Sequence, residues 1–240
     1  MKINTILSPQ LFPLFASDVV GKQVLVIDIL RATTSMVVML ENGATSVRPV
    51  AGVDEAMALK QGQAGLLIAG ERNGYKVEGF DFGNSPQEFT KDRVEGESLV
   101  ITTTNGTQAI SLSLAASHIW VGGFLNMTAL VEAICGVGDE VFLFCAGWKG
   151  HVNMEDTLFA GAVAQALVNK GWEVGDDASR AAMALWGQAQ GDLHGFLAEA
   201  SHVQRFQSMH AESDLDVCLQ MNTSSKAVLY ENGVLVAIPS

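Results

Sequence analysis

Short apolar runs, polar or glycine-rich loops and helical patterns follow one another along the chain. VLVIDI leads through RATTS to MVVMLENG at 24–43, and EVFLFCAG leads through WKGHVNMED to TLFAGAVAQALVNKG at 140–171. Asn42-Gly43 and Gly171 stand where helix C-caps are expected. Strands that alternate with helices of about 10–15 residues are typical of layered α/β proteins. We therefore predict an α/β/α fold around a mostly parallel or mixed central sheet.

Two other segments fit this unit less completely. GLLIAGERNG at 65–74 predicts a strand that feeds a polar loop, and SLVITTT at 98–104 predicts a strand followed by NGT. The segment after the second strand is ambiguous. Its Asn-Gly pair and the alternating apolar residues from Ile110 to Leu114 indicate a hairpin, whereas a helix stacks Ile110 and Leu114 one turn apart. The pattern alone favours neither.

The C-terminal part of the chain combines helical and hairpin patterns. The stretch 173–216 is rich in alanine, and we expect its helical pattern to break at Gly187, Gly191 and Gly195. The tail AVLYENGVLVAIP alternates around an Asn-Gly pair. That pattern predicts a β-hairpin that joins the sheet.

The composition is that of a folded protein. Hydrophobic residues make up 48% of the 240 residues, charged residues make up 17%, and only 5 residues are proline. We predict a single α/β domain over residues 1–240. The alternative is two α/β halves that meet near residues 120–138.

Charge and cysteine content narrow the class of function. A formal net charge of −12 argues against a surface that binds nucleic acid. If the ligand is an anion, its binding site needs locally gathered cations or a bound metal ion. We see no signal peptide and no apolar stretch near the ~20 residues of a membrane span. Cys135, Cys145 and Cys218 are odd in number and far apart, which favours reduced thiols in a cytoplasmic protein.

The run VIDILRATTS ends in an acid, a base and hydroxyls. An acid at a strand end is typical of haloacid-dehalogenase phosphatases, but their second acid is replaced here by Leu30. Arg31 offers a planar fork for an oxyanion, and Thr33, Thr34 and the amides of a starting helix offer more donors. The alternative is a helix cap at Thr33 or Ser35 with Asp28 paired to Arg31.

The segment GERNGYKVEGFDFGNSP at 70–86 concentrates charge and glycine. It carries Glu71, Glu78 and Asp81, and it is too long and aperiodic for a simple turn. Mg²⁺ binds through one or two carboxylates plus ligand oxygens, so this loop is a candidate metal site. A solvated charged loop is the alternative, although Gly-Phe-Asp-Phe-Gly suits water poorly.

Two more motifs follow strands. TTTNGT at 102–107 suits anion contacts if a helix follows it. Asn153 and Asp156 resemble an N-cap and a first-turn acid, and Glu155-Asp156 equally suits a metal ion. No histidine is spaced to activate Cys145. We interpret the five histidines as structural or surface residues; they are His118, His151, His194, His202 and His210.

Taken together, these motifs resemble the 2-phosphosulfolactate phosphatase family. The resemblance rests on VIDILRATT, GERNG, EGFDFGNSP, TTNGT, CAG, EDTLFAGA, DDA and DVC, in this order along the chain. It implies that TTNGT opens a helix. It also implies Mg²⁺-dependent hydrolysis of a phosphate monoester to 3-sulfolactate and phosphate. The segments WKGHVNM and LQMNTSSKAVLYENG depart from the family pattern.

The chemistry of the side chains then predicts a site. We expect catalytic roles for Asp28, Arg31, Glu155 and Asp156, and Mg²⁺ ligands among Asp28, Glu71, Asp81, Glu155 and Asp156. The expected substrate-binding residues are Arg31, Thr33, Thr34, Arg72, Asn73, Lys76, Asn84, Ser85, Thr104, Asn105, Gly106, Thr107 and Lys149.

The predicted partner is a small anionic phosphorylated substrate, with no nucleic acid or membrane, and a homodimer is an open expectation. Two alternatives remain: a phosphatase for another small phosphorylated 2-hydroxy acid, and a non-catalytic anion-binding protein of the same fold.

Overall fold

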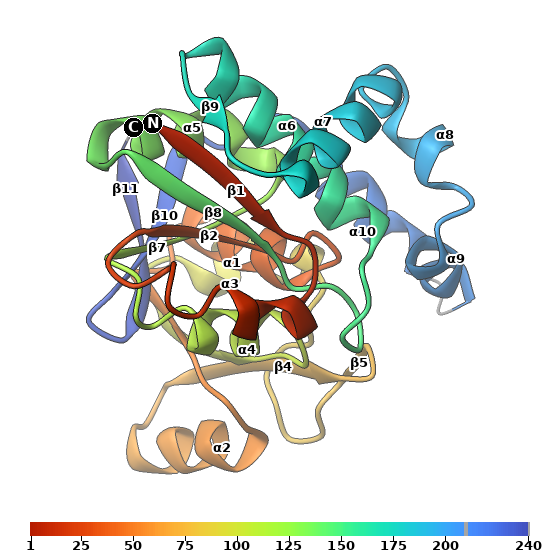
Figure 1. Cartoon of the computed structure of the whole chain (residues 1–240). Coiled ribbons are helices and arrows are strands. Elements are labelled where there is room, and N and C mark those ends of the chain that lie inside the picture. The colour runs from red at the N-terminus through yellow and green to blue at the C-terminus, as the bar shows by residue number, and fades with distance from the viewer. Residues whose placement is uncertain (209–210, 240) are drawn as a thin grey trace.

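A mixed β-sheet forms the centre of the molecule (Figure 1). The computed structural model describes residues 1–208 and 211–239. In this part of the chain eleven strands follow the order β5-β4-β6-β3-β11-β10-β7-β2-β8-β1-β9. Their bounds are β1 Lys2–Ile6, β2 Gln23–Ile27, β3 Ser46–Pro49, β4 Leu67–Arg72, β5 Tyr75–Lys76, β6 Ser98–Thr102, β7 His118–Gly122, β8 Glu140–Cys145, β9 Glu173–Val174, β10 Lys226–Glu231 and β11 Val234–Pro239.

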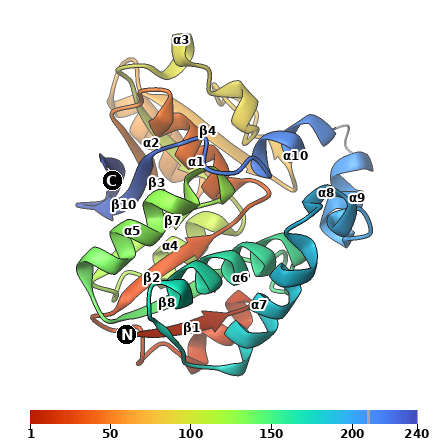
Figure 2. The ribbon, with the colours of Figure 1, turned by 90° about the horizontal axis from the view of Figure 1, so that it is seen from above.

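Helices cover both faces of this sheet (Figure 2). They are α1 Ala32–Glu41, α2 Val53–Gly62, α3 Lys91–Val94, α4 Gly106–Leu112, α5 Met127–Val137, α6 Met154–Asn169, α7 Asp177–Ala189, α8 Leu193–Leu197, α9 Ser201–Ser208 and α10 Glu212–Cys218, with short 3-10 helices η1 Pro9–Leu14, η2 Pro86–Glu88 and η3 Phe124–Asn126. Alternate side chains of β2 face the two helical layers. Leu25 and Ile27 pack under α5, α6 and α7, whereas Val24 and Val26 pack under α1 and α4. The predicted layered α/β fold is confirmed.

The C-terminal hairpin lies inside the sheet rather than at its edge. β10 and β11 pair with each other and are antiparallel to β7 and β3 on their outer sides. Three antiparallel pairings separate the two parallel blocks, so β3-β6-β4 runs opposite to β7-β2-β8-β1 along the sheet. The carboxyl ends of β4 and β6 nevertheless meet those of β2 and β8 at one pocket, because the sheet twists and curves between the two blocks.

The sheet also curves strongly around α1 and α4. Five inter-strand steps separate β6 from β2 in the strand order, which would span about 24 Å in a flat sheet. Nevertheless Leu99 and Ile101 of β6 share one apolar cluster with Val24 and Val26 of β2. This curvature brings the loop after β6 next to the loop after β2.

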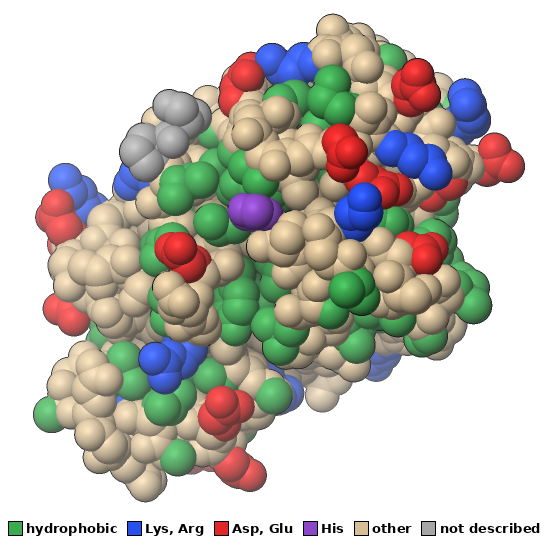
Figure 3. Space-filling model, turned by 60° about the vertical axis from the view of Figure 1, so that its left-hand side comes forward, with side chains coloured by type: hydrophobic (Ala, Val, Ile, Leu, Met, Phe, Trp, Pro, Cys, Tyr) green, Lys and Arg blue, Asp and Glu red, His purple; other side chains and the backbone are tan. Residues whose placement is uncertain are grey.

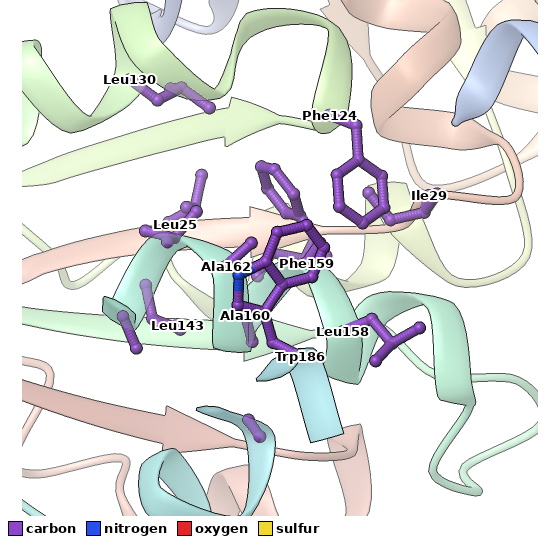
Figure 4. Packing of buried hydrophobic residues seen from close by; sticks show 14 of the residues in the cluster. Leu25, Ile29, Phe124, Leu130, Leu143, Leu158, Phe159, Ala160, Ala162 and Trp186 are labelled. Carbon is purple, nitrogen blue, oxygen red and sulfur yellow. The ribbon is translucent and has the colours of Figure 1, made fainter. Parts of the chain in front are cut away.

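The core anchors the end of β2. Phe124 packs on Phe159 with ring centroids 5.0 Å apart and on Trp186 at 6.0 Å (Figure 4). Ile29 and Leu30, which follow Asp28 directly, are buried in the same cluster. Asp28 is therefore held at a fixed place by apolar neighbours in the sequence.

Several local predictions are confirmed. TTNGT opens helix α4, and the tail forms the β10–β11 hairpin with positive φ at Asn232 and Gly233. Helix α6 has Asn153 as its N-cap residue, and Gly43 and Gly171 follow their helices in left-handed backbone conformation. The strands before and after residues 120–138 belong to one sheet in the described part of the chain, and the single-domain organisation stays a prediction.

One local prediction is partly wrong. Gly187 lies inside α7 and Gly195 lies inside α8, so only Gly191 separates helices. At Gly195 the side chain of Asp192 accepts the backbone N–H at 2.9 Å, which caps a new helix there.

On the face drawn in Figure 3, the described Lys and Arg side chains are interspersed with Asp and Glu and form no continuous basic band. Among the described residues, every helix is too short or too polar to cross a bilayer.

Candidate active site

Loops at the carboxyl ends of four strands border one pocket. Asp28 follows β2, Glu71 belongs to β4, residues 103–105 follow β6, and Trp148 and Lys149 follow β8. Helix α9 supplies the remaining wall. The lining residues are Asp28, Leu30, Arg31, Glu71, Asn73, Gly74, Asn84, Thr103, Thr104, Asn105, Trp148, Lys149, His202, Arg205 and Phe206.

The pocket is narrow in this structure. Its free volume is about 40 Å³, and roughly 10–15 Å³ of such volume suffices for one water molecule. The pocket therefore has room for a few water molecules beside its carboxylates.

Asp28 lies in a buried, negatively charged environment. Its Oδ1 accepts a hydrogen bond from the first amide of α1 at 3.2 Å. A Cβ at Gly106 would stand 2.9 Å from its Oδ2, so a glycine is needed for α4 to approach this closely. Burial raises the pKa of Asp28 to about 6; the α1 amide and His202 lower it, and the charges of Glu71 and Glu155 raise it. A cation beside Asp28 would relieve this charge repulsion.

Glu71 holds the two neighbouring loops in place. Its Oε1 accepts hydrogen bonds from N and Oγ1 of Thr104 at 2.8 and 2.9 Å, and its Oε2 accepts one from Gly74 N at 2.6 Å. Asn73 and Gly74 form an Asn-Gly turn with φ of 56° and 86° between β4 and β5. Glu71 thus presents an oriented carboxylate at the pocket wall.

Asp156 joins the ends of β2 and β8. Its Oδ1 accepts a hydrogen bond from Ile29 N at 2.8 Å, and its Oδ2 accepts one from Gly147 N at 3.0 Å. Burial, followed by the charges of Glu155 and Asp28, holds the pKa of Asp156 well above its ordinary range. Asp156 does not line the pocket, so its contacts position the two loops rather than a ligand.

Glu155 faces His202. Its Oε1 accepts a hydrogen bond from Asn153 Nδ2 at 2.9 Å and lies 2.5 Å from His202 Nδ1. Its Oε2 is buried and has no hydrogen-bond partner among the described residues. Trp148 stacks on His202 at 5.7 Å, and Phe206 packs edge-on at 5.2 Å. We expected a structural or surface role for His202, but the structure places it in the pocket wall.

Arg31 connects the loop after β2 to the C-terminal helices. It forms a buried ion pair with Asp214, and its Nη2 donates to Gly74 O at 3.2 Å. Asp214 also accepts a hydrogen bond from Ser85 Oγ at 2.6 Å. The partner of Arg31 is therefore Asp214 and not Asp28. Arg31 Nε is buried without a hydrogen-bond partner in the described structure, so a ligand oxygen in the pocket could satisfy it.

Helix α9 closes the rim. Arg205 Nη2 donates to Asn73 O at 2.5 Å, across the pocket from its own helix. The Phe206 ring lies 5.0 Å from the Arg31 guanidinium carbon. Residues 202–206 carry no motif in the sequence, and only the packing of α9 on the strand ends reveals them.

The structure does not bring Asp81 or Lys76 into the pocket. Asp81 forms an ion pair with Lys60 at 2.6 Å and accepts a hydrogen bond from Ile68 N at 2.8 Å. Although burial raises its pKa, the Lys60 hydrogen bond and charge lower the pKa of Asp81 overall. Lys76 Nζ donates to Asp81 O at 2.7 Å. Lys60 of α2 thus holds the Asp81 carboxylate in a structural ion pair outside the pocket.

Several predicted substrate contacts also serve the scaffold. Hydroxyls of threonines and the guanidinium of an arginine bond to groups of nearby strands and loops: Thr33 to Gly122 O at 2.8 Å, Thr34 to Ile29 O at 2.9 Å, Thr107 to Thr103 O at 2.9 Å, and Arg72 to Thr102 Oγ1 at 2.9 Å. The predicted residues that line the pocket are Asp28, Arg31, Glu71, Asn73, Asn84, Thr104, Asn105 and Lys149. Of the other histidines, His118, His151 and His194 do not line it, and His210 lies outside the described residues.

The carboxylates fit a cation that is shared with a ligand. Among the described residues, no three His, Cys, Asp or Glu side chains form a metal-binding group by themselves. Mg²⁺ does not require one, because it commonly binds through one or two carboxylates, waters and phosphate oxygens. Asp28 and Glu71 line the pocket together, and Glu71 raises the pKa of Asp28.

Comparisons with known proteins identify the family of the chain. A family model described as 2-phosphosulpholactate phosphatase matches residues 12–233. The chain belongs to this family. A relative from Thermotoga petrophila, named probable 2-phosphosulfolactate phosphatase, is 39% identical over 92% of this chain and 94% of its own length.

Other relatives carry the same name. The Thermotoga maritima protein is 37% identical over 92% of this chain and 94% of its own. The Clostridium acetobutylicum protein is 34% identical over 98% of this chain and all of its own. The resemblance inferred from the motifs is confirmed, and so is the phosphatase class that it implied. The segments VIDILRATT, GERNG and TTNGT, on which the resemblance rested, supply one wall of the pocket, at Asp28, Arg31, Glu71 and residues 103–105.

Proposed function

We propose that the protein hydrolyses 2-phosphosulfolactate to 3-sulfolactate and phosphate in this pocket. The family assignment supports the substrate class. The observation that carries the proposal is the buried, unpartnered Nε of Arg31 at a pocket that Asp28 and Glu71 also line. An oxyanion suits the planar guanidinium, and Mg²⁺ held by the two carboxylates would balance the charge.

Asp28 and Glu71 would hold the metal ion. When bound, Mg²⁺ would stabilise negative charge on the phosphoryl oxygens and favour attack at phosphorus. Glu71 orients the turn after β6 through Thr104, while Asp156 fixes the ends of β2 and β8. These contacts hold the reacting groups in place before substrate binds, which is what precise positioning in phosphoryl transfer requires.

His202 would protonate the leaving oxygen. Its Nδ1 lies against the buried Glu155, which orients the ring. That contact leaves Nε2 as the nitrogen that exchanges a proton with the ligand. The stacked Trp148 and the edge-on Phe206 exclude water from this ring.

The remaining expectations belong to this proposal. We propose a cytoplasmic enzyme, since the net charge is −12 and the three cysteines are free thiols in the structure. We expect neither nucleic acid nor membrane as a partner, and a homodimer remains a prediction. A phosphatase for another small phosphorylated 2-hydroxy acid and a non-catalytic anion-binding protein are the competing proposals.

Phosphate release tests the proposal. Purified protein should release phosphate from 2-phosphosulfolactate, lose this activity in excess chelator and regain it with Mg²⁺. Ca²⁺ should restore it poorly, because its larger, looser coordination sphere positions the phosphoryl group less well. Undiminished turnover in chelator would exclude the metal. Comparable turnover of 2-phospholactate would favour the broader phosphatase, and binding without any phosphate release would favour the binding protein.

A further inference from the structure

Two cations share one indole ring at the pocket. Lys149 Nζ lies 4.7 Å and Arg205 Cζ lies 4.6 Å from the centroid of the Trp148 ring. All three residues line the pocket. The two charges repel each other, so an anion that contacts both would be stabilised more than by either cation alone.

The loop after β8 fixes the position of Lys149. Lys149 has φ of 51°, a left-handed conformation that is strained for a residue with a Cβ, and Gly147 and Gly150 beside it have φ of 59° and 80°. A Cβ at Gly147 would stand 2.3 Å from His151 O, so the loop tolerates only glycine there. In the described part of the chain, Lys149 forms no ion pair. Its charge is therefore held at the pocket without a counter-ion of its own.

Arg205 contacts the same ring from a distant part of the sequence, helix α9. Helix α9 places it against Trp148, and its hydrogen bond to Asn73 O carries the guanidinium across the rim. Arg205 lines the pocket at this rim, so its guanidinium lies within reach of a ligand bound there. The chain has only 14 Lys and Arg residues against 26 Asp and Glu, yet three of those cations line this pocket (Arg31, Lys149 and Arg205).

We propose that Lys149 and Arg205, seated on Trp148, form a subsite for a second anionic group of the substrate. The phosphoryl group occupies the neighbouring site at Asp28 and Arg31. The inference rests on the proposed function and deepens it, since it adds Arg205 and Trp148 to the Lys149 contact that the sequence suggested. It predicts that α9 decides which phosphorylated acids are selected.

The test compares four phosphate esters with the wild type and Arg205→Gln. The esters are 2-phosphosulfolactate, 2-phospholactate without the sulfonate, 1-sulfopropan-2-yl phosphate without the carboxylate, and isopropyl phosphate without either. Gln keeps a donor for Asn73 O but removes the charge. The matched control is Arg180→Gln, on the exposed surface of α7.

Arg205→Gln should lower kcat/KM about 10- to 100-fold for esters that carry the recognised acid, the size expected for a hydrogen bond to a charged group. Isopropyl phosphate should stay within about threefold of wild type, and Arg180→Gln should change none of the values. The two single-acid esters identify the recognised group as sulfonate or carboxylate. An equal loss for all four esters, or no loss for any, would overturn the subsite.

A binding measurement separates this inference from the proposed function. If the wild type releases no phosphate from any ester, the proposed function fails, and calorimetric titration with 3-sulfolactate then decides the subsite. Binding by the wild type that weakens about tenfold in Arg205→Gln supports it. No binding, or equal binding by both proteins, overturns it.

Discussion

The two walls of the pocket are built in different ways. The strand-end wall consists of Asp28, Glu71 and residues 103–105, and its carboxylates accept hydrogen bonds from backbone amides. The helical wall, consisting of residues 202–206 of α9, is held by side chains, through ring stacking, the Glu155–His202 contact and the Arg205–Asn73 bond. The first wall is therefore set by the local fold of each loop, whereas the second depends on how α9 docks.

The largest expected effect concerns the strand-end wall. Asp28→Asn should reduce kcat/KM about 1000-fold, because it removes the charge that would hold Mg²⁺ against the substrate. Asp81→Asn is the matched control, since Asp81 was predicted as a ligand but pairs with Lys60 outside the pocket. It should stay within about threefold of wild type. Steady-state kinetics over a range of Mg²⁺ concentrations measures both, and equal behaviour of the two variants would remove Asp28 from the site.

The next effect concerns the connection between the walls. Asp214→Asn leaves the buried Arg31 without its anionic partner and should destabilise the protein by about 3 kcal/mol. Asp216→Asn serves as its control, because Asp216 forms an exposed pair with His194 at 3.2 Å and should cost less than about 0.5 kcal/mol. Urea unfolding measures both. Equal midpoints would mean that the ion pair does not hold α10 in solution.

The sequence predicted the strand-end wall because its residues stand in a local context. An apolar strand, a polar turn and a helix start place Asp28 and residues 103–105 at the carboxyl ends of their strands, and the pattern is contained within about ten residues. It did not predict which acid faces the pocket. Asp156 and Asp81 look equivalent to Asp28 in the sequence. In the structure, backbone amides bind the carboxylate of Asp156, and Lys60 forms an ion pair with Asp81.

The helical wall could not be predicted in the same way. His202 and Arg205 lie in an alanine-rich helical stretch without a metal or nucleophile spacing. His202 contacts Glu155, which is 47 positions away in the sequence, and Arg205 contacts Asn73, which is 132 positions away. Likewise, the sequence predicted the tail hairpin from its Asn-Gly turn but not its place in the middle of the sheet. Long-range pairing of this kind leaves no periodic pattern in either partner.

A smaller effect tests whether the helical wall takes part in chemistry. His202→Gln should lower kcat about 100-fold with a substrate whose leaving alkoxide needs a proton. The loss should shrink with p-nitrophenyl phosphate, because its leaving group is stable as an anion. Rates with both substrates, measured at saturation, distinguish proton donation from a structural role. An equal loss with both would assign His202 to positioning alone.

The metal-free protein should show the cost of the buried charge at Asp28. Since its pKa is raised from an ordinary 3.8 to about 6, the folded state binds the proton more tightly than the unfolded state. The stability from this group is therefore present below about pH 4 and is lost as the pH rises through 6. At pH 7.5, metal-free Asp28→Asn should melt at or above the wild-type melting temperature, because its free energy of unfolding should be higher by up to about 3 kcal/mol. Near pH 4 this difference should disappear.

Asp81→Asn should behave in the opposite way, because the pKa of Asp81 is lowered in the folded protein. Its stability contribution is present at neutral pH and is lost as the pH falls. Thermal melts of the two variants in chelator, at pH 4.5 and 7.5, compare the signs directly. A lower melting temperature for Asp28→Asn at pH 7.5 would contradict the proposed charge repulsion.

The smallest expected effect separates two neighbours at one strand end. Cys145 pairs with Ile27 in the sheet, one residue before Asp28, but its side chain is buried in the core under α5 and α6. Burial, followed by the charges of Asp156 and Glu155, holds the pKa of its thiol well above the ordinary range, so it stays protonated and is a poor nucleophile. Cys145→Ala should therefore keep kcat/KM within about threefold of wild type and lose about 1 kcal/mol of stability from the small cavity. Kinetics with an unfolding curve checks both values. A well-folded but inactive Cys145→Ala protein would show that catalysis requires this thiol, and it would contradict the role assigned to Asp28.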